Sequence, residues 1–443
     1  MKISRSVAYK IYNLKDGKKG IFFNRNSQNY MFLEGLSAEL FDLLLSNDIT
    51  ALNMWLDNND ITADDVEEFK EEIKQFENDV KKSVDKANSS NSVKEAYNPI
   101  LSDFIEELHR NGLYYSFHID LTNRCNEKCI HCYHPFDTYQ ISKELNTSEV
   151  KSLIDIIDDL GVFDVTLSGG EALLREDIEE IFEYISEKGM MISLYSNGLL
   201  LSEEVVSKLC EYRIKTVSIS LYGDIAEVHD QITTVQGSFE RTLKGIEILK
   251  KYKIPFDLKC VMLSQNINRA NEILAFFNSL NDGKECKIDF SLCGKLNGDC
   301  ENFQYMPSEQ EIEKVFYGNP ERYIGNRDLL QRSPDQAPCS AGKYGLYCSA
   351  EGEIYPCVSF RLHLCNYKDL PYISENLILK QWQKTRIRDF TECFTHSYCN
   401  YCTEQCAGNN LIENGNYLNS RVRQCVHAKI IEKWFLHEEK GGE

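Results

Sequence analysis

The chain has 443 residues, of which 42% are hydrophobic, and its 69 acidic and 49 basic residues give a formal net charge of -20. A globular chain of this length predicts two to four domains, and its acidity argues against nucleic acid as a partner. No signal-peptide core and no run of about 18 apolar residues is found, so a cytoplasmic protein without a membrane partner is expected.

Residues 1–84 are predicted to form a small module of strands followed by helices. Two or three helices are expected, and the clearest begins near Val66 with apolar residues at helical spacing. The polar run 86–92 has the composition of a linker, so 85–112 is expected to hold a linker and one helix. Turn signals separate the three predicted strands, near 7–14, 20–24 and 30–33.

Residues 113–330 alternate strand-like and amphipathic helical segments, which predicts an α/β class with a parallel sheet. The sheet is either doubly wound or curled into a partial barrel, and in both forms ligands gather at the carboxyl ends of the strands. The predicted strands lie near 114–121, 164–168, 190–195, 216–221, 256–262 and 287–291. The predicted helices include 147–160, 202–212, 238–251 and 268–280.

The 17 cysteines are unevenly placed, with none before Cys125 and nine between Cys339 and Cys425. In a reducing compartment thiols are not expected to form a disulfide framework, so clustered cysteines indicate metal or redox sites. Helical periodicity fades beyond about residue 331. The segment 331–443 is therefore predicted to be a loop-rich domain folded around metal.

The first cysteine group follows directly after the first predicted strand of this α/β region. Three thiolates from one short loop can hold three irons of a 4Fe-4S cluster and leave the fourth iron without a protein ligand. The alternative is a zinc site with His131 or His134 as fourth ligand, although structural zinc motifs usually pair CxxC or Cys/His knuckles. The group has CxxxCxxC spacing followed by an aromatic residue, and consists of Cys125, Cys129, Cys132 and Tyr133.

This motif resembles the signature of the radical S-adenosylmethionine (radical SAM) superfamily. The resemblance covers residues 114 to about 291 and implies a partial (β/α)6, TIM-like barrel. In that superfamily S-adenosylmethionine chelates the open iron, and an electron from the cluster cleaves it to a 5'-deoxyadenosyl radical. The resemblance implies that the cluster ligands are Cys125, Cys129 and Cys132.

Three further predicted strand ends resemble cofactor-binding segments of the same superfamily. The tripeptide from Gly169 to Glu171 is similar to the GGE motif that meets the methionine amino group, where glycine permits close backbone approach. Ser196-Asn197-Gly198 and Ser218-Ile219-Ser220 resemble segments that end the third and fourth strands, the latter facing the ribose. The resemblance implies cofactor contacts from Tyr133, Gly169, Gly170, Glu171, Asn197 and Ser220.

The carboxy-terminal cysteines resemble the SPASM extension of radical enzymes, which binds two auxiliary 4Fe-4S clusters. The compact group has the order C-x5-C-x2-C-x3-C, whereas the usual form places the two-residue gap first. The resemblance implies one cluster on Cys339, Cys348, Cys357 and Cys406, and another on Cys393, Cys399, Cys402 and Cys425. Without Cys348 the first cluster would keep an open iron that a substrate thiolate could occupy.

The carboxy-terminal cysteine group has one alternative interpretation, which is a pair of zinc ribbons. Cysteines outside both groups are expected to be small buried apolar residues rather than ligands. These are Cys210, Cys260, Cys286, Cys293, Cys300 and Cys365.

The amino-terminal module resembles the winged-helix precursor-recognition element of peptide-maturing enzymes. There the leader of the substrate adds as a fourth strand to the sheet edge and packs on a helix. The resemblance implies a leader groove lined by Asn29, Tyr30 and Phe32 together with the Val66 helix. A plain capping domain is the alternative.

Together these resemblances imply a radical maturase of a ribosomally synthesised precursor peptide, similar to sactipeptide and ranthipeptide thioether synthases. A Cys thioether is the first product considered, with carbon-carbon cross-linking, epimerisation and formylglycine formation on a sulfatase as alternatives. An iron-sulfur electron carrier is the non-enzyme alternative. An external electron donor of the flavodoxin or ferredoxin type and a monomer or dimer are expected, while no catalytic acid, base or hydrogen donor is identified.

Overall fold

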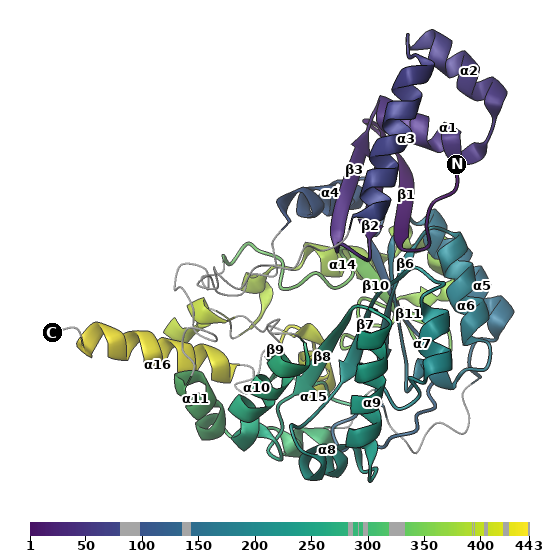
Figure 1. Ribbon diagram of the computed structural model, residues 1–443. Coiled ribbons are helices and arrows are strands. Elements are labelled where there is room, and N and C mark those ends of the chain that lie inside the picture. The colour runs from purple at the N-terminus through teal and green to yellow at the C-terminus, as the bar shows by residue number, and fades with distance from the viewer. Residues whose placement is uncertain are drawn as a thin grey trace.

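The computed structural model describes residues 1–79, 98–134, 143–281, 287–290, 292–295, 300–318, 333–391, 393, 395–402, 406–419 and 425–441. The predicted linker 86–92 and Cys286 lie outside the described residues. The amino-terminal strands and helices stand at one end of a larger α/β body (Figure 1). Among the described helices, none has the length and apolar character needed to cross a membrane.

The amino-terminal module is a three-stranded antiparallel sheet followed by three helices. The strands are β1 (Val7–Leu14), β2 (Gly17–Asn24) and β3 (Asn29–Glu34), in the spatial order β1-β2-β3. The helices are α1 (Leu36–Ser46), α2 (Ile49–Asn58) and α3 (Ala63–Asn78). One face of the sheet packs on these helices, because Val7, Phe22 and Leu33 share a buried core with Phe41 and Ile73.

The opposite face of this sheet packs on the α/β body. There Tyr12, Ile21 and Phe23 share a second core with α4 (Pro99–Arg110) and with residues next to the amino ends of the central strands, including Tyr115 and Phe163. The module therefore lies at the amino ends of the central strands, away from the loops that follow their carboxyl ends.

In the described part of the α/β body, the six strands from β4 to β9 lie parallel and in chain order, and the sequence predicts each of them to within a few residues. The order has no reversal, whereas a doubly wound sheet requires one, so the arrangement is that of a partial (β/α)6 barrel. The strands are β4 (Ser116–Asp120), β5 (Asp164–Ser168), β6 (Met191–Ser196), β7 (Ile214–Ser220), β8 (Phe256–Val261) and β9 (Lys287–Asp289).

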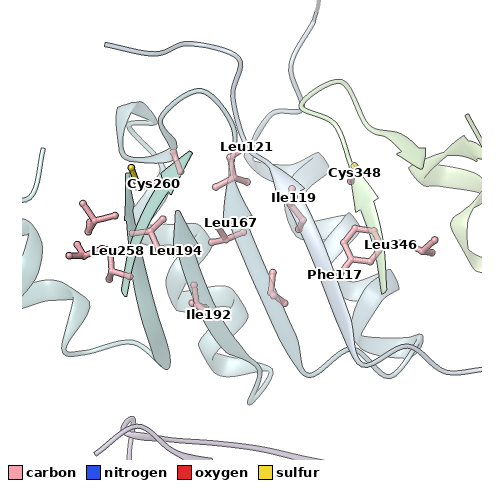
Figure 2. Packing of buried hydrophobic residues seen from close by; sticks show 14 of the residues in the cluster. Phe117, Ile119, Leu121, Leu167, Ile192, Leu194, Leu258, Cys260, Leu346 and Cys348 are labelled. Carbon is pink, nitrogen blue, oxygen red and sulfur yellow. The ribbon is translucent and has the colours of Figure 1, made fainter. Parts of the chain in front are cut away.

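Helices follow these strands and bury their apolar sides against the sheet. Figure 2 shows Ile119, Leu167 and Leu194 projecting from neighbouring strands into this core. The helices are α5 (Thr147–Asp159), α6 (Ile178–Glu187), α7 (Glu203–Leu209), α8 (Ala226–Thr233), α9 (Ser238–Lys251), α10 (Ala270–Leu280) and α11 (Glu309–Gly318).

The carboxy-terminal segment continues the same sheet, which the sequence did not predict. Strand β10 (Gly345–Cys348) pairs in parallel with β4, and β11 (Glu353–Tyr355) and β12 (Cys365–Asn366) extend the sheet to nine strands among the described residues. With four, three and two residues, these strands are too short to give a periodic signal. The helices α14 (Leu377–Lys384), α15 (Ala407–Asn414) and α16 (Val426–Gly441) follow.

Candidate functional site

The loop after β4 brings Cys125, Cys129 and Cys132 together. The Cys132 N–H donates to the carbonyl oxygen of Cys129 at 3.0 Å, and the Ile130 N–H donates to that of Ile232 in α8 at 2.9 Å. Burial raises the pKa of Cys125 to about 12, and Cys132 is near enough to add to the shift. Burial also raises the pKa of Cys129, with Glu127 and both other cysteines adding. Thiols that lie close together raise one another's pKa because their thiolates repel. A cationic metal centre bound between them would offset this repulsion between thiolates.

The two histidines of the zinc alternative have contacts of their own. The His131 ring packs edge-on against Tyr222 with 4.7 Å between ring centroids, and burial lowers the pKa of His131 to about 4. The Nε2 atom of His134 lies 3.4 Å from the Asp120 carboxylate. In the parts of the chain that the structure describes, no group of three or more His, Cys, Asp or Glu side chains is arranged to hold a metal ion. A 4Fe-4S cluster is wider than one ion, so its thiolates surround a cage.

Gly169 and Gly170 lie directly against the cysteine loop. The Gly170 N–H donates to the carbonyl oxygen of Thr122 at 2.7 Å, and the Glu171 N–H donates to that of Arg124 at 2.9 Å. A Cβ atom on Gly169 would overlap the Thr122 carbonyl oxygen, and one on Gly170 would overlap the Arg124 carbonyl oxygen. The GGE segment therefore forms a cradle for the loop that no larger residue could form.

The predicted cofactor contacts at the ends of β5 and β6 belong to one hydrogen-bonded group. The Glu171 carboxylate accepts from the Asn197 N–H at 2.8 Å and from the Ser196 hydroxyl at 3.1 Å. Burial raises the pKa of Glu171 to about 7. The Asn197 side-chain amide donates to Asn126 at 2.6 Å and lies 3.9 Å from the Cys125 sulfur. Glu171 and Asn197 thus lie beside the cysteine loop.

Tyr133 lies in the cysteine loop itself, directly after Cys132, and Ser220 lies at another strand end. The Tyr133 ring lies 4.6 Å from the His134 ring, between centroids. Ser220 ends β7 and pairs with Lys259 of β8. Both residues are half-buried. Their positions fit a site that extends from the cysteine loop along the carboxyl ends of the strands.

Sequence reasoning missed a group of polar side chains inside the barrel. Asp120, the last residue of β4, accepts a hydrogen bond from the Tyr347 hydroxyl, and Arg361 donates to the same hydroxyl at 2.8 Å. Burial opposes ionisation of Asp120, yet the adjacent His118 and His134 hold its pKa well below the usual range. The available sequence signal was the position of the acidic residue Asp120 at the carboxyl end of a predicted barrel strand.

The carboxy-terminal cysteines form two separate groups. Cys339, Cys357 and Cys406 line one cavity of about 1230 Å³. Burial raises the pKa of Cys425 to about 12, with Cys402, Cys399 and Cys393 adding, so these four residues are neighbours. This grouping matches the implied second cluster and three members of the first.

Cys348 does not join the first group. It ends β10 opposite Ile119, is fully buried, and belongs to the sheet core rather than to the cavity lining. Figure 2 shows its side chain among the core residues of the sheet. The implied ligand Cys348 is thus a strand residue whose side chain the alternation of β10 directs into the core.

Two of the residues predicted for a leader groove, Tyr30 and Phe32, are not brought together with the Val66 helix. The Phe32 ring lies 5.4 Å from the Phe104 ring of α4, between centroids, and the Tyr30 hydroxyl lies 3.3 Å from the Tyr115 hydroxyl. Val66 in α3 packs on the opposite face of the sheet. The prediction of one groove lined by both is wrong, because alternate residues of a strand face opposite sides. Asn29, at the start of β3, donates to Asp79 just after α3 at 3.1 Å.

Comparisons with known proteins agree with this geometry. The model of the radical SAM superfamily matches residues 119–277. An AdoMet-dependent heme synthase of Methanosarcina barkeri is 38% identical over 148 residues, which are 33% of this chain and 42% of that protein. The match thus spans less than half the length of the first curated relatives.

Three longer similarities extend beyond the barrel. The antilisterial bacteriocin subtilosin biosynthesis protein AlbA of Bacillus subtilis is 25% identical over 333 residues, 72% of this chain and 71% of that protein. The solved structure of Streptococcus suis SuiB bound to precursor peptide SuiA covers 96% of this chain and 99% of its own, with 16% identity and a TM-score of 0.56. Native anSMEcpe with bound AdoMet covers 73% and 97%, with 20% identity and a TM-score of 0.57.

The matched residues include the Cys125 loop, the cradle formed by Gly169 and Gly170, and Asn197. Residues 119–277 of this chain are therefore similar to the radical SAM superfamily both in the family model and in the motifs of the site.

Proposed function

We propose that this chain is a radical SAM maturase that modifies a ribosomally synthesised precursor peptide and installs a cross-link, with a Cys thioether as the first candidate. The observation that best supports radical chemistry is the close contact of the Cys125 loop with Gly169 and Gly170, which leaves no space for a side chain between them. The extent of the similarities to AlbA and to the peptide-bound SuiB structure supports a peptide substrate.

The residues of the loop and of the neighbouring strand ends fit the cofactors of the superfamily. A 4Fe-4S cluster held there supplies the electron that cleaves S-adenosylmethionine to methionine and a hydrogen-abstracting 5'-deoxyadenosyl radical. Cys125, Cys129 and Cys132 would hold the cluster. The buried Asn197 side chain and the Glu171 carboxylate would orient polar groups beside it, since both lie within one hydrogen-bonded group with Asn126.

The carboxy-terminal cysteines fit a role in removing an electron. A thioether forms when a substrate Cys loses its thiol proton and a substrate carbon loses a hydrogen atom to the deoxyadenosyl radical, and one further electron must leave. Two auxiliary 4Fe-4S clusters supply an acceptor for that electron. Cys339, Cys357 and Cys406 would hold the first, and Cys393, Cys399, Cys402 and Cys425 the second. A flavodoxin- or ferredoxin-type protein would deliver the electron for the initial cleavage.

The amino-terminal module is suited to bind the leader of the peptide. Its sheet has an edge at β3, which pairs with β2 and with no other described strand. An extended peptide can add to such an edge through backbone hydrogen bonds.

The similarity to the heme synthase covers only a third of this chain. It therefore gives no support for heme synthesis from the amino-terminal module or from the carboxy-terminal cysteines.

Mass spectrometry of the peptide tests this proposal. The anaerobically reconstituted chain should form 5'-deoxyadenosine from S-adenosylmethionine under reduction, and a co-expressed Cys-containing precursor should lose two hydrogens for each cross-link. A thioether also removes one Cys from alkylation by iodoacetamide, whereas a carbon-carbon cross-link leaves every Cys reactive. Epimerisation leaves the mass unchanged, and formylglycine formation removes the Cys sulfur.

Matched cysteine variants provide the control. Cys129→Ala should abolish 5'-deoxyadenosine formation, whereas Cys210→Ala should not, because Cys210 lies at the end of α7 away from the loop. Reduced wild-type chain that contains iron but forms no 5'-deoxyadenosine would leave the electron carrier as the better interpretation.

A further inference from the structure

We propose that Cys293 supplies the fourth thiolate of the first auxiliary cluster, together with Cys339, Cys357 and Cys406. This inference rests on the proposed function, which supplies the cluster itself. Cys293 lies in the segment after β9, outside the carboxy-terminal cysteine group, and replaces Cys348 in the predicted ligand set.

The first observation is a shared cavity. Cys293, Cys339, Cys357 and Cys406 all line the cavity of about 1230 Å³, and Cys348 does not. Four thiols on one cavity wall equal the number that a fully protein-bound 4Fe-4S cluster requires.

Hydrogen bonds connect the Cys293 segment to both neighbouring ligand segments. The Cys293 sulfur lies 2.8 Å from the Ser359 hydroxyl, two residues after Cys357. The Asn409 side-chain amide donates to the carbonyl oxygen of Leu292 at 3.1 Å. Because Asn409 belongs to α15, whose N-cap residue is Cys406, this bond holds the Cys293 segment next to Cys406.

Close packing fixes the same three segments. A Cβ atom on Gly294 would lie 2.7 Å from the Cγ2 atom of Ile412 in α15, and a Cβ atom on Gly408 would overlap the carbonyl oxygen of Ser359. The segment after β9 therefore packs against the Ile412 side chain of α15, and the backbone of the first turn of α15 packs against the loop after Cys357. Such contacts leave little freedom for Cys293 to move away from the group.

The charge environment agrees with this proximity. Burial raises the pKa of Cys293 to about 11, the Ser359 hydroxyl opposes the shift, and Cys406 adds to it. Burial raises the pKa of Cys357 to about 12, with Cys406 adding most after burial. Cys406 is thus an electrostatic neighbour of both residues. Cys348 instead has Asp120, Glu353, Glu351 and Cys365 as neighbours.

A fourth protein thiolate changes what the first auxiliary cluster can do. With Cys293 bound, no iron of that cluster is open to a substrate thiolate. The cluster would then serve the maturation reaction by accepting an electron, and the substrate Cys would be held by other groups of the cavity.

Electron paramagnetic resonance of a variant that retains only auxiliary clusters tests the assignment. In a Cys125→Ala, Cys129→Ala, Cys132→Ala background, Cys293→Ala should leave one iron of the first cluster without a protein thiolate. Mild ferricyanide oxidation should then release about one iron per chain and produce a 3Fe-4S signal. Addition of 2-mercaptoethanol should shift the spectrum of the reduced variant, because the exogenous thiol can occupy the open iron.

Cys348→Ala is the matched control, since it also removes a buried thiol, and it should retain the iron content and spectrum of the background. The assignment is overturned if Cys293→Ala keeps the background spectrum, or if Cys348→Ala alone changes it. Should Cys293→Ala not fold, Cys293→Ser keeps the size and a hydrogen-bonding group towards Ser359, and an unshifted spectrum in that variant overturns the assignment equally. A wild-type chain that forms no 5'-deoxyadenosine would contradict the proposed function while leaving the auxiliary-cluster spectra readable.

Discussion

Glu171 is a buried carboxylate, 1% exposed, whose pKa burial raises to about 7. In the unfolded chain a glutamate titrates near pH ~4.3. Between these values the folded chain binds a proton that the unfolded chain has released. The resulting stabilisation is fully present below the unfolded pKa and is lost as the pH rises through about 7.

We therefore expect the free energy of unfolding of the cluster-free chain to decrease between pH 5 and pH 8, by up to about 3 kcal/mol from Glu171. Glu171→Gln should reduce this decrease without removing it, because burial also raises the pKa of Glu127 to about 7. Urea unfolding at several pH values measures the slope. Glu247→Gln, an exposed change on α9, is the control, and equal slopes in the two variants would contradict the burial argument.

At the scale of residues, the sequence predicts those site members that lie close together along the chain. Cys125, Cys129 and Cys132 share one loop and are identified by their spacing, whereas Gly169 and Gly170 share one turn and are identified by their resemblance to the GGE motif of the superfamily. Cys293 carries no such pattern, because its partners come from segments that meet only in the folded chain. Cys348 has the spacing of a ligand but lies on a strand too short to be recognised.

At the scale of elements, the two edges of the amino-terminal sheet are not equivalent. The Tyr9 N–H of β1 donates to the carbonyl oxygen of Gly189 at 2.9 Å, so the α/β body already uses that edge. Strand β3 pairs only with β2 among the described strands. A fourth strand supplied by a peptide would therefore add to β3.

Hydrogen exchange can test this asymmetry. Addition of the full-length precursor peptide should slow amide exchange in residues 29–34 by roughly tenfold or more, because backbone groups at the open edge become paired. Residues 7–14 form the internal control and should be unchanged. Protection of 7–14 without protection of 29–34, or no protection with a peptide that is modified, would exclude leader addition at β3.

The elements themselves were predictable where buried apolar residues recur along a strand. Each of the strands β5 to β8 has buried apolar residues at alternate positions, and the sequence locates these strands to within two residues. The error at Tyr30 and Phe32 arose within a correctly predicted strand. It concerned which face those residues occupy, and that depends on packing against α4, a contact that the local pattern does not encode.

At the scale of the whole molecule, the amino-terminal module is docked firmly on the amino ends of the central strands. The Tyr12 hydroxyl donates to the carbonyl oxygen of Gly161 at 3.0 Å, Lys10 pairs with Asp158, and Arg213 donates to the carbonyl oxygen of Ser4 at 2.9 Å. The cysteine loop follows the carboxyl end of β4. If a leader binds at β3, as proposed above, the peptide would have to extend from one end of the central strands to the other.

A pair of glycine substitutions tests the docking. Gly189 and Gly112 both have φ of +79°, but a Cβ atom on Gly189 would overlap the Tyr9 carbonyl oxygen, whereas nothing lies within 4 Å of one on Gly112. Both Ala variants share a backbone strain of about 1 kcal/mol. We expect Gly189→Ala to cost roughly 2 kcal/mol more and to expose residues 1–79 to limited proteolysis. Equal unfolding midpoints and equal cleavage rates for the two variants would contradict this contact.

The pairing of β10 with β4 sets a lower limit on the fragment that can be expressed. A fragment cut near residue 330 would leave the backbone amides and carbonyls of Ser116 to Ile119 without the neighbour that β10 provides. An exposed edge strand with unpaired backbone groups pairs readily with other chains, so the isolated barrel should aggregate during purification. Truncation studies should accordingly retain the chain through Asn366, the end of β12, before asking which chemistry the shortened protein keeps.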